Sequence, residues 1–239
     1  MDCANSCPNM MRFMLRRNPR KRKTEGLPTC QICGLWEQFC VCDLLPRVPS
    51  KVDFLLIQHS SELLRQSNTA RLAKKMISPC EIITWGSREI PYEQDALKNP
   101  AHRNLVLYPR TESRLLEAGD LHAPEGKSTN LILLDATWAQ AKSMSRRIPG
   151  LQDLTFVSLP QHPPPSWKLR RSPGRGYFCT LEAVIRAIAV MEGEDHVRPL
   201  ELSLELVMAR GLHMRGKLNK HQMERTCRPI IERLEAMRG

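Results

Sequence analysis

The chain has 239 residues, of which 41% are hydrophobic, so it is long enough for one large domain, or a main domain with a small appendage, with its own core, and we do not expect disorder throughout. Its 36 Lys and Arg residues outnumber 25 Asp and Glu, and the resulting net charge of +11 favours a polyanionic partner such as nucleic acid. No apolar run is long enough to span a bilayer, and the N-terminus lacks the features of a secretory signal. We therefore expect a cytoplasmic protein without a membrane partner.

Residues 1–26 form the first recognisable region, which is polar and dense in cations. The cations of this region are Arg12, Arg16, Arg17, Arg20, Lys21, Arg22 and Lys23. So little of this stretch can be buried that it is expected to be a flexible arm. It is either a solvated tail or an arm that neutralises phosphates, and its charge density favours the second interpretation.

Residues 27–48 contain four closely spaced cysteines, and we expect them to bind zinc. Cys30 and Cys33 form a C-x-x-C pair, and Cys40 and Cys42 follow after six intervening residues. Four thiolates at this spacing can surround one Zn²⁺ ion tetrahedrally and leave no coordination position open, which indicates a structural metal. The alternative is a group of unligated thiols, and in a chain of this kind the clustering favours zinc.

From residue 49 to residue 239 short apolar runs alternate with helix-like segments, which predicts an α/β domain with a mainly parallel sheet. The expected strands are 52–57, 81–84, 104–108, 131–134 and 154–158. The expected helices are 62–76, 111–117, 139–147, 181–191 and 223–237. Between residues 162 and 176 the chain is rich in Pro, Arg and Gly, so we expect a long loop there.

Polar residues follow three of the expected strands, where ligands of open parallel sheets gather. These residues are Gln58, His59 and Glu62, then Tyr108, Pro109 and Arg110, and finally Asp135, Thr137 and Trp138. Each also has an ordinary structural interpretation, such as a helix cap for Asp135 or a packing residue for Trp138. The chain has no dinucleotide-binding glycine fingerprint, no P-loop and no G-x-S-x-G elbow, which argues against those three classes of site.

The block from Asp135 to Trp138 resembles the Asp-x-Thr-Trp signature of the DTW-domain family. Other landmarks of that family follow in its order across roughly residues 28 to 190: the four cysteines, Gln58-His59 with Glu62, Tyr108-Pro109, Leu169-Arg170 and Thr180-Leu181-Glu182-Ala183. The sequence departs from the family pattern at Ala136, where Gly is common, and at Ser60, where Pro often follows the histidine.

The resemblance implies a SPOUT-like fold, in which the C-terminal part of the parallel α/β domain threads a trefoil knot. It also implies S-adenosylmethionine as cofactor, bound by loops at the strand ends. Carried over to this chain, the cofactor-binding positions are Leu107, Tyr108, Pro109, Asp135, Trp138, Arg170, Thr180, Leu181 and Glu182.

The activity implied by the resemblance is transfer of the 3-amino-3-carboxypropyl group of S-adenosylmethionine to N3 of a tRNA uridine, with release of 5′-methylthioadenosine. Asp135 is the expected general base, with Thr137 orienting it, and Arg170 or Arg171 pairs with the cofactor carboxylate or an RNA phosphate. The residues expected to contact tRNA are His59, Glu62, Arg16, Arg17, Lys21, Lys168 and Arg171.

Two other functions remain open on the sequence alone. A zinc-ribbon RNA-binding protein without catalysis would have no affinity for S-adenosylmethionine, and a SPOUT-type methyltransferase would release S-adenosylhomocysteine. A monomer and a homodimer are both compatible with the sequence.

Overall fold

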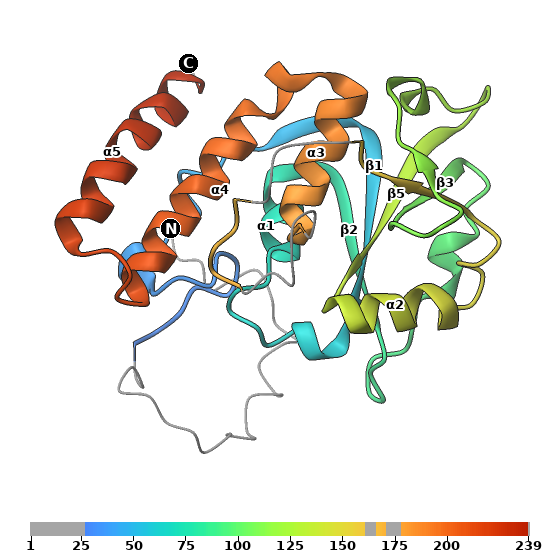
Figure 1. Cartoon of the computed structure of the whole chain (residues 1–239), viewed down its shortest axis with the longest axis horizontal. Coiled ribbons are helices and arrows are strands. Elements are labelled where there is room, and N and C mark those ends of the chain that lie inside the picture. Colours follow the sequence, from blue (N-terminus) through green and yellow to red (C-terminus); the bar gives the residue numbers. More distant parts are fainter. Residues whose placement is uncertain (1–26, 161–165, 171–177, 239) are drawn as a thin grey trace.

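The computed structural model describes residues 27–160, 166–170 and 178–238 and is built around a six-stranded sheet (Figure 1). The strand order is β2-β1-β5-β3-β6-β4, and every pair of neighbouring strands is parallel. The mainly parallel sheet predicted from the sequence is therefore present. The strands are β1 (Val48–His59), β2 (Ile77–Trp85), β3 (His102–Leu107), β4 (Arg114–Leu115), β5 (Ser128–Asp135) and β6 (Thr155–Ser158).

Helices cover both faces of the sheet, because the central strands are apolar on both sides. Along β1, Phe54 and Leu56 face one buried cluster, whereas Leu55 and Ile57 face another that includes Met144 of α2. The first cluster holds residues of the other four helices. The helices are α1 (Ala70–Met76), α2 (Trp138–Arg147), α3 (Thr180–Glu192), α4 (Glu194–Met214) and α5 (Lys220–Ala236).

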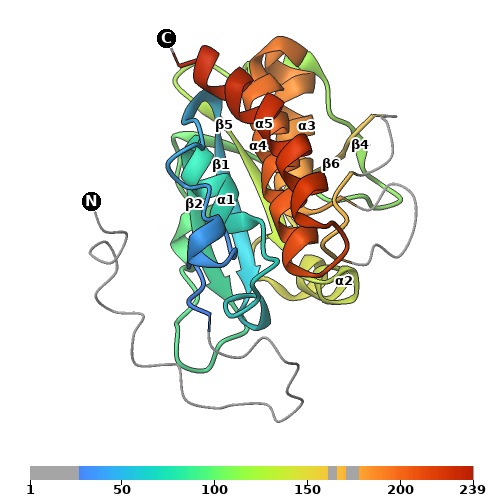
Figure 2. The ribbon, with the colours of Figure 1, turned by 90° about the vertical axis from the view of Figure 1, so that its left-hand side faces the viewer.

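The three C-terminal helices are layered outward from the sheet, with α3 against β1 and β5, α4 on α3, and α5 on α4 (Figure 2). Gly193 separates α3 from α4 with a φ of +103°, a conformation that a residue with a Cβ rarely adopts. The sequence analysis expected α3 and α5 but not α4. None of these helices combines the length and the apolar character that crossing a bilayer requires.

The helix expected over residues 62–76 is wrong in its first half. A 3₁₀ turn covers Ser60–Glu62, and α1 begins only at Ala70. The intervening segment contains a polar run in which the Asn68 side chain accepts a hydrogen bond from the Ala70 N–H at 3.0 Å. Such local bonds compete with helix formation and place the start of α1 after the polar run.

The helix expected over residues 111–117 is absent, and the short strand β4 lies there instead, paired with the edge of β6. The Ser113 hydroxyl donates to the Tyr108 carbonyl and accepts from the Arg110 N–H, both at 2.9 Å, so the chain turns sharply after β3. Residues 111–117 contain too few apolar side chains to define a helical face. The segment therefore pairs with the open edge of the sheet instead of forming a helix.

The cysteine-containing segment at the N-terminal end of the described chain packs on α4. The Arg210 guanidinium donates to the carbonyls of Phe39 and Cys40 at 3.0 and 2.9 Å. The Phe39 ring meets His213 edge-on, with centroids 5.2 Å apart. This segment therefore shares its core with the α/β body.

Candidate functional site

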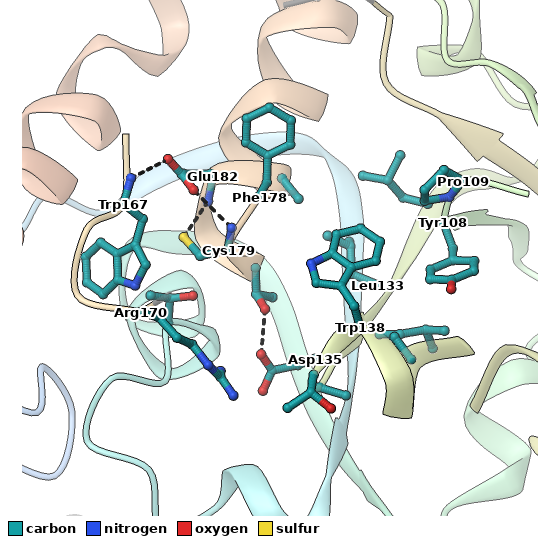
Figure 3. Close-up of a pocket in the computed structure, with 18 of the residues that line it drawn as sticks. Tyr108, Pro109, Leu133, Asp135, Trp138, Trp167, Arg170, Phe178, Cys179 and Glu182 are labelled. Carbon is teal, nitrogen blue, oxygen red and sulfur yellow. Dashed lines mark hydrogen bonds between the residues drawn. The ribbon is translucent and has the colours of Figure 1, made fainter. Parts of the chain in front are cut away.

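A cavity of about 440 Å³ opens at the carboxyl ends of β3, β5 and β6 (Figure 3). The loop before α1, the described residues 166–170 and the start of α3 complete its walls. Its volume lies in the range of small-molecule sites. In Figure 3, Tyr108 and Trp138 lie on one side, Trp167 and Arg170 on the other, and Asp135 between them. Eight of the nine positions expected to bind the cofactor line this cavity: Leu107, Tyr108, Pro109, Asp135, Trp138, Arg170, Thr180 and Glu182.

Asp135 is the last residue of β5, and its carboxylate is almost fully buried. Oδ2 accepts hydrogen bonds from the side-chain amides of Gln58 at 2.7 Å and Asn68 at 2.6 Å, and Oδ1 accepts from the Thr180 hydroxyl at 2.5 Å. Burial raises the pKa of Asp135 above its ordinary value, against the opposing effect of these three donors. The carboxylate thus joins the ends of β1 and β5 to the start of α3.

Thr137 caps α2 and does not bond to Asp135. Its hydroxyl lies 2.6 Å from the Gln140 side-chain oxygen and accepts the Gln140 N–H at 3.3 Å, in a reciprocal capping box. The Gln140 side chain also donates to Ser61 at 2.9 Å, and Ser61 donates its N–H to the His59 ring. The orienting contact expected from Thr137 is made by Thr180 instead, because Thr137 begins a helix whose first turn needs its hydroxyl.

Glu62 forms a bidentate ion pair with Arg170 at the edge of the cavity. The two N···O distances are 2.9 and 2.6 Å, and Arg65 approaches the same carboxylate at 3.2 Å. The Glu62 side chain is completely buried, and the hydrogen bonds to it raise the pKa of Arg170. Glu62 therefore neutralises Arg170 within the protein and itself lies behind the cavity wall.

Glu182 organises the segment that enters α3. Its Oε1 accepts the backbone N–H groups of Ser166 at 2.6 Å and Trp167 at 2.9 Å, and Oε2 accepts the Cys179 N–H at 2.9 Å. This fixes Trp167 in the cavity wall, where it is 8% exposed. The indole N–H of Trp167 has no hydrogen-bond partner among the described residues, and its nitrogen lies on the side of the ring that faces Arg170 (Figure 3).

The cavity combines aromatic walls with two carboxylates that receive hydrogen bonds only from uncharged donors among the described residues. Trp138 and Tyr108 lie with ring centroids 6.0 Å apart and planes 31° from parallel. Asp135 and Glu182 supply the carboxylates, while the charge of Arg170 is balanced by Glu62. Such a site favours a ligand that carries both a flat ring and positive charge.

The four cysteines expected to bind metal converge on one point. All four sulfurs lie within 4.8 Å of one another, with 3.5 Å between those of Cys30 and Cys42 and 3.8 Å between those of Cys33 and Cys40. Sulfurs placed tetrahedrally around zinc at bonding distance are about 3.8 Å apart, so the donor set fits the ion. Hydrogen bonding with Cys42 lowers the pKa of Cys33 to about 5, whereas burial raises that of Cys40 to about 12. A bound divalent cation would allow all four thiols to ionise together.

Several expected contacts lie elsewhere. Leu181 is fully buried behind the cavity and donates its N–H to the Thr69 hydroxyl at 3.3 Å, and Lys168 is exposed on the surface. Arg16, Arg17, Lys21 and Arg171 lie outside the described residues.

The cavity is also lined by residues that the sequence analysis did not single out: Ser67, Thr69, Leu133, Leu134, Ser158, Leu159, Trp167, Phe178 and Cys179. The sequence did offer one signal for Trp167, which is its position two residues before the Leu169-Arg170 motif.

The fold and the site define an α/β protein with a small-molecule cavity at the carboxyl ends of a parallel sheet and a separate four-cysteine cluster. The DTW domain profile matches residues 27–212, and the chain belongs to this family.

Three curated relatives of the chain share the name tRNA-uridine aminocarboxypropyltransferase 2. The Drosophila melanogaster protein is 30% identical over 177 residues, which cover 71% of this chain and 68% of that protein. The Mus musculus protein is 27% identical over 80% of this chain and 67% of its own length. The Macaca fascicularis protein is 26% identical over 82% of this chain and 68% of its own length. A solved structure, the crystal structure of spTrm10(74), aligns with 77% of this chain and 96% of its own at 10% identity, with a TM-score of 0.26.

Proposed function

We propose that this protein transfers the 3-amino-3-carboxypropyl group of S-adenosylmethionine to N3 of a uridine in tRNA and releases 5′-methylthioadenosine. One observation carries the proposal: in a chain of the DTW family, the residues expected to bind the cofactor gather around one cavity from separate segments. The shared name of the relatives supports the same activity.

The cavity suits S-adenosylmethionine in charge and shape. The aromatic pair Tyr108 and Trp138 offers flat surface to an adenine ring. Asp135 and Glu182 place negative charge around the cavity, which favours the sulfonium and ammonium groups. When bound, the cofactor supplies an electrophilic γ-carbon whose bond to sulfur breaks as the bond to N3 forms, so that sulfur leaves as a neutral thioether.

Asp135 is our proposed acceptor for the N3 proton. Gln58, Asn68 and Thr180 occupy three of the positions at which its two oxygens accept hydrogen bonds, which fixes the carboxylate and leaves Oδ1 with capacity for one more. A raised pKa strengthens a carboxylate as a base. Thr137 contributes indirectly, because it caps the helix that begins with Trp138.

Zinc held by the four cysteines has a structural role in this proposal, because four thiolates leave no position for a substrate.

For tRNA, the net charge of +11 supports binding through phosphates. We assign these contacts to Lys168 among the described residues, to Arg16, Arg17, Lys21 and Arg171 outside them, and to His59 at the end of β1. As the resemblance implies, we also place the chain in the SPOUT class with a C-terminal knot, and the wholly parallel sheet is compatible with that assignment.

Two labelled cofactors test the activity. Unmodified tRNA is incubated with the protein and S-adenosylmethionine labelled either in the aminocarboxypropyl carbons or in the methyl group. The proposal predicts label in tRNA only from the first cofactor, together with 5′-methylthioadenosine. Label from the methyl group with S-adenosylhomocysteine would establish a methyltransferase, and tRNA binding without cofactor binding would establish a non-catalytic RNA-binding protein.

The variant Asp135→Asn tests the proposed base. It is expected to lower kcat by about 100-fold or more, because the amide cannot accept the N3 proton. Calorimetry on the same preparation should give a Kd for S-adenosylmethionine no more than about tenfold above that of the wild type, because asparagine keeps the size of the side chain but loses the charge that attracts the sulfonium. Full activity would end the base assignment, and loss of cofactor binding would make Asp135 a cofactor ligand.

A further inference from the structure

The cysteine cluster touches the loop before α1 at a position where only glycine fits. Gly34, next to Cys33, has a φ of +70°, and a Cβ added there would lie 1.9 Å from the backbone oxygen of Gln66. The nearest atoms are backbone atoms, which cannot rotate away as a flexible side chain does. A weaker contact accompanies this one, because the Gln66 side chain donates to the Thr29 hydroxyl at 3.4 Å.

The same loop reaches the cavity two residues later. Asn68 is 2% exposed and donates to Asp135 Oδ2 at 2.6 Å, while its own oxygen holds the Ala70 N–H. Thr69 accepts the N–H of Leu181, the residue that follows Thr180. Residues 66–69 therefore connect the cysteine cluster to the Asp135 carboxylate through contiguous contacts.

We propose that Gly34 is a positioning residue for the cavity: its backbone contact with Gln66 holds residues 66–69 so that Asn68 orients the Asp135 carboxylate. The cysteine cluster thereby supports the cavity as well as the fold. A carboxylate held by short hydrogen bonds loses its orientation when one donor moves, since such bonds weaken steeply away from their preferred distance and angle. The identity of the ligand in this inference rests on the proposed function.

Gly216 provides a matched control. Its φ is +67°, nearly that of Gly34, but a Cβ added there meets nothing within 4 Å. Alanine is strained equally at both positions, because both have a left-handed backbone conformation. Only Gly34→Ala also displaces Gln66.

The test compares Gly34→Ala, Gly216→Ala, Asn68→Ala and the double variant of Gly34 and Asn68. Zinc content, melting temperature and the Kd for S-adenosylmethionine are measured for each variant. The Kd is measured at a temperature well below the lowest of the melting temperatures. Gly34→Ala is expected to retain zinc and to raise Kd about tenfold, comparable to losing one hydrogen bond to a charged acceptor. Gly216→Ala should leave Kd unchanged, and the double variant should bind no more weakly than Asn68→Ala alone.

A wild-type Kd in zinc-loaded Gly34→Ala, or independent effects that multiply in the double variant, would overturn the inference. If Gly34→Ala does not fold, Thr29→Val removes the weaker hydrogen bond to the Gln66 side chain and should raise Kd about twofold. An unchanged Kd in that variant would also reject the inference. If the wild type binds no S-adenosylmethionine, the proposed function fails instead. The free energies of unfolding of the two single variants and the double variant, measured in urea, then still decide whether Gly34 positions Asn68. Additive losses would reject that positioning role.

Discussion

Glu62 and Arg170, separated by 108 positions in the chain, form a bidentate ion pair that fastens the end of β1 to the loop preceding α3. The Glu62 side chain is fully buried, and that of Arg170 is 29% exposed. Because Arg170 lines the cavity while Glu62 lies behind its wall, the pair holds this part of the wall in place.

Removing Arg170 should destabilise the protein more than removing Arg65, although both approach Glu62. Arg170→Ala leaves a buried carboxylate with one partner at 3.2 Å, and we expect a loss of about 3 kcal/mol in the free energy of unfolding. Arg65, whose side chain is 47% exposed, should contribute less than about 1 kcal/mol. Urea unfolding of both variants measures the difference, and equal losses would show that Arg170 is not the main partner.

Asp135→Asn should stabilise the protein at neutral pH, in contrast to its effect on catalysis. Burial raises the pKa of Asp135, so the folded wild type loses stability as pH rises from the unfolded value, about 3.9, through the folded one. Asparagine resembles the protonated carboxyl at every pH. The stability gain should therefore shrink to near zero below about pH 4, which urea unfolding at several pH values can follow. A less stable variant at pH 7 would mean that the three hydrogen bonds outweigh the cost of burying the charge.

Cys33→Ser should abolish zinc binding and lower the melting temperature, because the segment carrying the four cysteines depends on the metal for part of its core. Cys227→Ser is the matched control: that thiol is also buried but lies in α5, outside the cluster. Elemental analysis of the purified variants should find about one zinc per chain in the control and none in Cys33→Ser. Carefully handled wild-type protein without metal would contradict the assignment.

Trp167→Phe should weaken binding of S-adenosylmethionine. The buried indole N–H has no partner among the described residues and lies in the cavity wall, so a bound ligand is the acceptor that would satisfy it. Losing one such hydrogen bond corresponds to about a fivefold to tenfold higher Kd. Calorimetry gives Kd, and the melting temperature without ligand reports any loss of packing separately. Unchanged affinity would place the ligand away from Trp167.

The sequence was sufficient for the parts of the fold that depend on local pattern. Apolar runs located β1, β3 and β5, and the polar residue that ends β5 marked Asp135. Even α4 could have been found, because Val197, Leu200, Leu204 and Val207 recur at helical spacing.

What the sequence could not indicate were relationships between distant residues. Nothing local distinguishes Thr180 from Thr137 as the partner of Asp135, since that choice depends on where α3 packs. The irregular segment before α1 was missed for the same reason. Its polar residues, such as Asn68, are satisfied by Asp135, which is 67 positions away.

The order of strands in the sheet has a consequence for synthesis of the chain. β5, which begins at Ser128, lies between β1 and β3, although both are translated before it. Until Asp135 has left the ribosome, β1 and β3 each expose a strand edge that has no native partner, and such edges invite association with other chains. A fragment that stops before Ser128 should therefore fail to form the native sheet, and the growing chain should be most in need of chaperone protection during this interval.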